Sequence, residues 1–149
     1  MKYGKKQLSV VLMTCIFTPQ ALAQDDESAI APDNYIYSTY HHCDVTKQDR
    51  ADEIVTDHQA PVYNQMREEG MITGWGWLAH HTGGHWRRLA YFAAPSLDAL
   101  LDAQDSFGER MEATAPKTPK EMGKICTAHD DYIWKYEVGK AVDSSGGAV

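Results

Sequence analysis

The side chains best suited to acid–base or metal chemistry in this chain are its seven histidines. An imidazole titrates near neutral pH, so it can act as a general acid, a general base or a metal ligand. We expect His41 and His81 to be the catalytic candidates, and the alternative for each is a hydrogen-bonded strand histidine. Six histidines form three short groups: His41-His42 before Cys43, His80-His81 and His85 around two glycines, and His129 three residues after Cys126.

Residues 74–92 combine aromatic side chains with a predicted tight turn. Gly83-Gly84 suits a two-residue type I′ turn, in which both residues need a positive φ. Pairing across this turn places eight side chains on one face, namely Trp75, Trp77, Ala79, His81, Trp86, Arg88, Ala90 and Phe92. We expect this face to line a barrel interior, where a small apolar or aromatic molecule is bound by Trp75, Trp77, Trp86 and Arg88. The alternatives are that the aromatic residues only fill a dimer core and that Arg88 forms a salt bridge.

The first 23 residues are typical of a secretory signal peptide. Three lysines precede an apolar run of about ten residues, too short to span a bilayer, and Ala21-Leu22-Ala23 follows as a cleavage site. We expect cleavage after Ala23 and a periplasmic or secreted product. An alternative is a lipoprotein box ending at Cys15, although Thr14 is bulkier than the residues usual in such a box.

Cys43 and Cys126 are the cysteines that remain after cleavage, and neither belongs to a C-x-x-C pair. In an oxidising compartment such a pair forms a disulfide, which is the pairing we favour. The alternative is a zinc or copper site that needs free thiolates and is formed by His41, His42, Cys126 and His129. His80, His81 and His85 alternate in direction, so they cannot all bind one ion. We therefore expect no metal and no cofactor.

Charge and length limit the classes of function. Cleavage removes three lysines and no acid, which takes the formal net charge from −7 to −10. Such a balance disfavours binding to nucleic acid or to anionic membranes. The 126 residues left are enough for one domain. We expect a flexible leader at 24–32, a domain at 33–139 and a disordered tail at 140–149.

Hydrophobic periodicity predicts the order β-α-β-β-α-β. Strands are expected at 35–43, on both sides of Gly83-Gly84, and at 132–138. An amphipathic helix from about Thr46 to Gly70 is interrupted or kinked at Pro61. A second helix begins at Ser96 as N-cap, and residues 113–124 form a loop that leads into one helical turn at 120–125. This order is the ferredoxin-like α+β arrangement, a four-stranded antiparallel sheet with both helices on one face.

Together with Glu69-Gly70 and Gly74-Trp75-Gly76-Trp77, this order resembles the dimeric α/β-barrel superfamily, over residues 33–139. That superfamily includes antibiotic-biosynthesis monooxygenases, EthD-like and NIPSNAP-like proteins, and chlorite dismutase relatives. The chain is most similar to small uncharacterised monooxygenase-like or NIPSNAP-like members. The resemblance implies that two sheets pair into a shared barrel as a homodimer. It transfers no catalytic residue.

These observations predict an exported homodimeric barrel protein that binds a small apolar or aromatic molecule. A cofactor-independent oxygenase or isomerase activity is one interpretation, and the residues leave open whether the protein is an enzyme. The alternatives are a non-catalytic periplasmic structural or interaction protein, whose aromatic face serves dimerisation only, and a metal-binding module.

Overall fold

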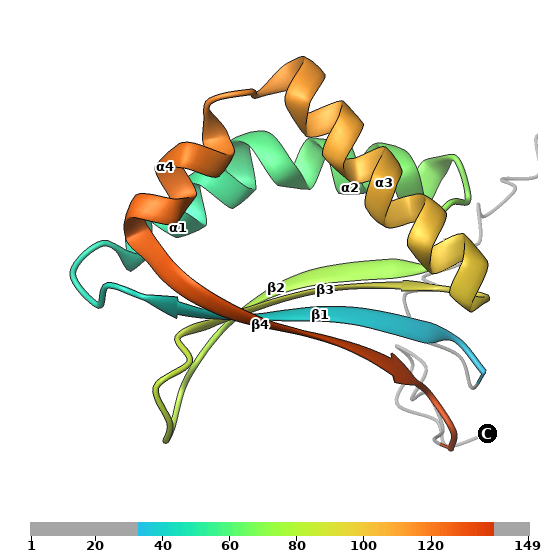
Figure 1. The fold of residues 1–149 in the computed structure, drawn as a ribbon, viewed down its shortest axis with the longest axis horizontal. Helices are drawn as coiled ribbons and strands as arrows, with labels where there is room; N and C mark the ends of the chain where they lie inside the picture. Colours follow the sequence, from blue (N-terminus) through green and yellow to red (C-terminus); the bar gives the residue numbers. More distant parts are fainter. Residues whose placement is uncertain (1–32, 139–149) are drawn as a thin grey trace, which may run out of the picture.

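The structure of the protein is a computed structural model that describes residues 33–138. The predicted signal peptide, leader and tail lie outside these residues. Four strands form one antiparallel sheet in the order β2-β3-β1-β4, and every helix of the described part lies on the same side of it (Figure 1). The predicted ferredoxin-like α+β fold is confirmed. The elements are β1 (Tyr35–Cys43), α1 (Gln48–Ile54), η1 (Val55–Gln59), α2 (Ala60–Glu68), β2 (Gly74–Ala79), β3 (Arg88–Ala94), α3 (Leu97–Thr114), α4 (Thr118–Ile125) and β4 (Cys126–Lys135).

The first helical region, α1, η1 and α2, covers the range predicted for the first helix and stays helical throughout. Its irregularity is the π-helical segment η1, which ends just before Pro61 in the first turn of α2. Proline has no N–H, so Pro61 cannot donate to the carbonyl four residues earlier, and the regular ladder is interrupted there. Ile54 of α1 and Met66 of α2 are the fully buried side chains of this region.

The second helical region contains one element more than expected. Ser96 caps α3 as predicted, because its Oγ accepts a hydrogen bond from the Ala99 N–H at 3.2 Å. The predicted loop that follows is largely helical, since α4 already begins at Thr118. β4 begins at Cys126, six residues earlier than predicted. Its first half is polar, which hides the strand pattern, and an edge strand tolerates such residues.

Cys43 and Cys126 form the predicted disulfide. The bond joins the last residue of β1 to the first residue of β4, across a sequence separation of 83. A cross-link closing a loop of that length stabilises the folded chain by about 4 to 5 kcal/mol in the chain-entropy account. The disulfide is buried in a cluster that also contains Ala51, Ile54, Val55, Met122 and Ile125.

The hairpin has the predicted register but faces the opposite way. Gly83 and Gly84 have φ values of +82° and +52°, as the turn requires, and the ladder pairs Trp75 with Phe92 and Trp77 with Ala90. The prediction that this face lines a barrel interior, on the side of the sheet away from the helices, is wrong. Trp75 stacks on Tyr63 of α2 with ring centroids 5.1 Å apart, and Trp75 and Trp77 both pack, partly buried, against the core beneath the helices.

Trp86 separates from the other tryptophans because it lies beyond the end of the ladder, which stops at Arg88. Its ring is 6.4 Å from that of Tyr40, on the side of the sheet that the helices leave open. The predicted set of eight side chains on one face is therefore divided at the tip of the hairpin.

The sheet surface opposite the helices, here called the open face, is rich in aromatic and aliphatic side chains. Leu78, Tyr132 and Trp134 are 48%, 45% and 48% exposed on it. Tyr91 lies flat across Gly76 of the neighbouring strand, where a Cβ atom would come within 2.5 Å of the Tyr91 ring. No element of residues 33–138 covers this surface (Figure 1). Within the same residues, no helix is both long enough and apolar enough to cross a membrane.

Candidate functional site

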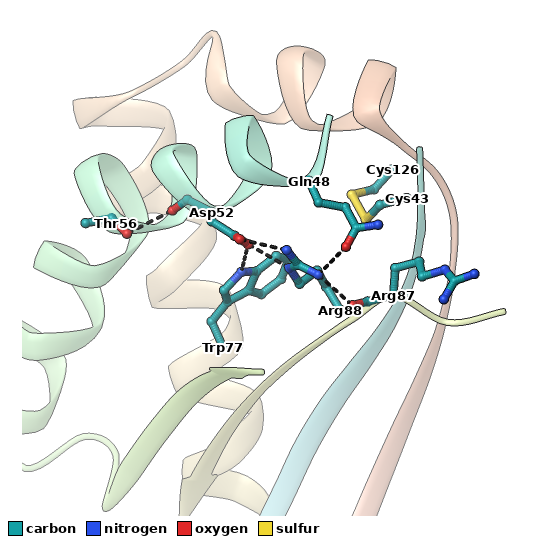
Figure 2. A network of polar contacts seen from close by, with 8 residues as sticks. All are labelled: Cys43, Gln48, Asp52, Thr56, Trp77, Arg87, Arg88 and Cys126. Atoms are coloured by element: carbon teal, nitrogen blue, oxygen red, sulfur yellow. Dashed lines mark hydrogen bonds and ion pairs between the residues drawn. A yellow bond between two sulfur atoms is a disulfide. The ribbon is translucent and has the colours of Figure 1, made fainter. Parts of the chain in front are cut away.

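Arg88 lies between the sheet and α1, where a polar network holds its guanidinium (Figure 2). Its Nε donates to Oδ1 of Asp52 and its Nη2 to Oδ2, both at 2.7 Å. Nη1 donates to the side-chain oxygen of Gln48 and to the carbonyl of Arg87. The Arg88 side chain is only 7% exposed. The salt-bridge alternative for Arg88 is therefore the arrangement found, and the ligand role of this residue stays a prediction.

Trp77 belongs to the same network, because its Nε1 donates to Oδ1 of Asp52 at 2.7 Å. These hydrogen bonds, above all those from Arg88, hold the pKa of the Asp52 carboxyl below its ordinary value, while Asp52 raises the pKa of Arg88. Figure 2 shows the side chain of Arg87, the residue just before β3, pointing away from the network. Asp52 and Gln48 were missed by sequence analysis, since acidic and amide residues on a solvated helix carry no distinguishing signal. The network fixes α1 on the hairpin.

The helix-side pocket is a hollow of about 670 Å³ between the sheet and α3 and α4. Two imidazoles, those of the cross-strand neighbours His41 and His129, lie at its sheet side. The lining residues are His41, Gln59, Phe107, Gly108, Met111, Glu112, Pro116, Thr118, Pro119, Met122, Gly123, Cys126 and His129. Most of this wall comes from residues 107–123, part of which was expected to be a loop, and sequence analysis missed it for that reason.

His41 is the predicted catalytic residue that lines this pocket. Burial, with a further contribution from His129, lowers its pKa from 6.5 to about 4, so its imidazole is uncharged at neutral pH. Its ring centroid lies 6.1 Å from that of His129 and 5.3 Å from that of Trp77. His129 in turn has its Nδ1 3.1 Å from a carboxylate oxygen of Asp131. The arrangement offers a neutral proton acceptor at the base of a largely apolar pocket.

His81, the other catalytic candidate, lies at the hairpin tip in a different environment. Its Nδ1 is 2.7 Å from the hydroxyl of Thr82, and the side chain is exposed. It lines a hollow of about 390 Å³ at the edge of the open face, together with Trp86, Tyr40 and Leu78. The structure therefore does not bring His41 and His81 together. It also separates Trp86 from Trp75 and Trp77.

The four residues of the metal alternative are divided between the two sides of the sheet. His41 faces the helices, whereas the ring of its neighbour His42 contacts His85 and Trp86 by the hairpin tip. The sulfur of Cys126 is committed to the disulfide. Among residues 33–138, no three His, Cys, Asp or Glu side chains are grouped so as to hold a metal ion.

Comparison with known proteins adds structural relatives only. No family model and no curated protein matches the sequence. A dimeric ferredoxin-like protein from an uncultured marine organism superposes with a TM-score of 0.59 at 10% identity, over 75% of this chain and 94% of its own. A NIPSNAP family protein from Agrobacterium tumefaciens gives 0.51 at 13% identity, over 68% and 90%. An uncharacterised NIPSNAP domain protein from Burkholderia xenovorans gives 0.52 at 12%, over 72% and 95%. The protein thus has the ferredoxin-like fold that NIPSNAP proteins share.

Proposed function

We propose that the protein is an exported homodimer that binds a small, largely apolar molecule in the helix-side pocket. The observation that carries the proposal is the pocket itself, which places two imidazoles at the base of a hollow of about 670 Å³. Ligand sites in proteins commonly measure about 300 to 1,000 Å³ and combine apolar walls with a few polar groups. The location differs from the predicted chamber between two sheets, because the hairpin faces the other way.

The lining defines the chemistry of the ligand. Phe107, Met111 and Met122 give it an apolar wall, and Met side chains adapt to irregular shapes. His41 is uncharged at neutral pH and can accept or donate one hydrogen bond. Glu112 disfavours an anionic ligand. The best match is an uncharged, partly aromatic molecule with one carbonyl or hydroxyl group.

An enzymatic role would use the same imidazole. Isomerisation or cofactor-independent oxygenation of such a molecule starts with loss of a proton from the ligand to a base. His41 is placed to take that proton on the unprotonated nitrogen of its neutral ring. His129, which lies near Asp131, is beside it. The low pKa of His41 makes it a weak base. The proton that it removes must therefore be an acidic one, on a ligand whose anion is stabilised by conjugation.

Dimerisation is supported by the open face. Its half-exposed Leu78, Tyr132 and Trp134 form the kind of apolar surface that a second copy covers. Gly76 lets the Tyr91 ring lie flat, which suits face-to-face packing of two sheets. One of the structural relatives is itself described as dimeric. Sedimentation of the mature chain tests the dimer independently of ligand binding.

The ligand proposal is tested by filling the pocket. Gly108 and Gly123 line it on helices, and a Cβ added at either meets nothing within 4 Å. Gly108→Leu should therefore extend a side chain from the pocket wall, and its Cβ meets no neighbouring atom. Glu109→Leu, the next and exposed residue on the same helix, adds the same side chain outside the pocket.

The measurement uses N-phenyl-1-naphthylamine, an uncharged aromatic fluorophore, titrated into the mature protein. We expect saturable binding by the native chain and by Glu109→Leu, and binding at least tenfold weaker by Gly108→Leu. Equal binding by all three variants would overturn the assignment of the pocket. Native mass spectrometry of protein purified from its own compartment would identify a retained ligand in the same preparation.

A further inference from the structure

A second hollow lies outside the proposed ligand site, between α1 and α4. We call it the basic groove, and it measures about 710 Å³. Its lining residues are Lys47, Arg50, Lys117, Lys120, Glu121, Lys124 and Ile125. Five of these seven side chains are cationic and one is acidic. No feature of the proposed function uses them.

The positive charges of the groove are only partly neutralised by acidic neighbours. Arg50 forms ion pairs with Glu121 at 2.8 Å and with Glu53 at 2.9 Å, and Lys47 pairs with an aspartate at 3.0 Å. The ammonium groups of the other three lysines have no carboxylate oxygen within 4.0 Å among residues 33–138. These lysines are Lys117, Lys120 and Lys124. Lys117 is the N-cap residue of α4, and the spacing of three and four residues aligns it with Lys120 and Lys124 along one side of the helix.

This concentration of positive charge contrasts with the rest of the chain. The formal net charge is −7, and the outer face of α3 carries Asp98, Asp102, Asp105 and Glu109. Like charges along one side of a helix repel each other. A concave patch of one sign also raises the local concentration of ligands of the opposite sign.

The two walls of the groove are held in fixed positions. The ion pair between Arg50 and Glu121 joins α1 to α4, and the N–H of Asp44 donates to the carbonyl of Ile125 at 2.9 Å. The disulfide begins at the next residue, Cys126. Figure 1 shows α1 and α4 side by side at one end of the molecule. These contacts hold together the two backbone segments that carry the cationic side chains.

We propose that the basic groove binds a small soluble anion that carries at least two phosphate or carboxylate groups. Cations line both walls, so a ligand must present more than one negative group to contact both. Lysine ammonium groups bind phosphate and carboxylate oxygens as point charges, without the fixed geometry of an arginine fork. The groove is concave and its single apolar lining residue, Ile125, is buried, which suits a soluble anion better than a membrane surface.

The test is titration calorimetry of the mature protein with sodium tripolyphosphate and with citrate, at constant ionic strength near that of plasma. Acetate serves as the monovalent control. The double variant Lys120→Gln/Lys124→Gln removes two charges from the groove, and Arg67→Gln/Lys135→Gln removes two charges elsewhere. We expect the first to weaken binding of at least one polyvalent anion by tenfold or more and the second by less than threefold.

Lys120→Arg/Lys124→Arg should restore the affinity, because it restores the charges. If both double variants weaken anion binding equally, net charge alone explains the effect and the proposal is overturned. The absence of binding heat for both polyvalent anions would also overturn it. Binding to phosphatidylglycerol vesicles, without a response to either soluble anion, would assign the groove to a membrane surface and overturn it too. Circular dichroism of each variant confirms that it is folded.

Discussion

The network around Arg88 gives a quantitative prediction for the stability of the fold. Asp52→Ala removes the carboxylate that accepts three hydrogen bonds, two from Arg88 and one from Trp77. Breaking a buried ion pair costs about 3 to 5 kcal/mol, whereas an exposed pair contributes about 0 to 1 kcal/mol. The Arg88 side chain is 7% exposed and that of Asp52 is 39% exposed, so water partly screens the charge that is left. We expect the free energy of unfolding to fall by about 2 to 3 kcal/mol.

The assay is urea unfolding at pH 7, followed by circular dichroism, with Glu53→Ala as the matched control. Glu53 is the adjacent residue and pairs with Arg50, but its side chain is 61% exposed, so its loss should cost at most about 1 kcal/mol. A double-mutant cycle with Arg88→Met separates the pair from the packing of each side chain. If Asp52→Ala costs no more than Glu53→Ala, the network does not fix α1 and the reasoning fails.

The same network predicts a pH dependence. The folded chain depresses the pKa of Asp52, so this carboxylate contributes stability above its unfolded pKa of about 3.9 and loses it as the pH falls through the folded value. The difference in unfolding free energy between the native chain and Asp52→Ala should therefore shrink below about pH 4. A difference that stays constant from pH 7 to pH 3 would contradict an ionic role for Asp52.

Three further outcomes are expected. Reducing the bond between Cys43 and Cys126 should lower the free energy of unfolding by up to about 5 kcal/mol, measured in urea with and without dithiothreitol; no change would mean that the reduced unfolded chain is already compact. Gly76→Ala should displace the ring of Tyr91 and weaken the proposed dimer at least tenfold in sedimentation, whereas unchanged sedimentation would contradict a dimer contact on the open face. Because the pKa of His41 is lowered from 6.5 to about 4, stability should decline as the pH falls from 6.5 to 4, and His41→Phe should lose this part of the decline. An NMR titration that gives His41 an ordinary pKa would exclude its burial.

Local chemistry made much of the fold predictable. The register of the hairpin follows from the two glycines at its turn. Ser96 indicates where α3 starts, because a hydroxyl side chain before an apolar run is a typical N-cap. α4 was missed as a full helix because Pro119 and Gly123 reduce its helical pattern. The early start of β4 was missed because an edge strand needs no alternation of apolar residues.

The candidate site was less predictable, for a physical reason. The alternation of side chains along a strand predicts which of them share a face of the sheet, but it does not predict which face the helices cover. The larger rings of Trp75 and Trp77 bury more apolar surface under the helices, while Gly76 leaves room for a tyrosine on the other side. His41 was identified by its residue type alone. Its partners come from α3, α4 and β4, which only tertiary packing brings together.

The disulfide between Cys43 and Cys126 has a consequence for when each hollow can form. Cys126 lines the helix-side pocket, and Ile125 and Lys124 before it line the basic groove. One sulfur–sulfur bond therefore anchors a wall of both. In the reducing cytoplasm this anchor would be absent, and passage to an oxidising compartment would install it. If the chain is exported as proposed, neither hollow would be fully assembled until the protein had left the place of its synthesis.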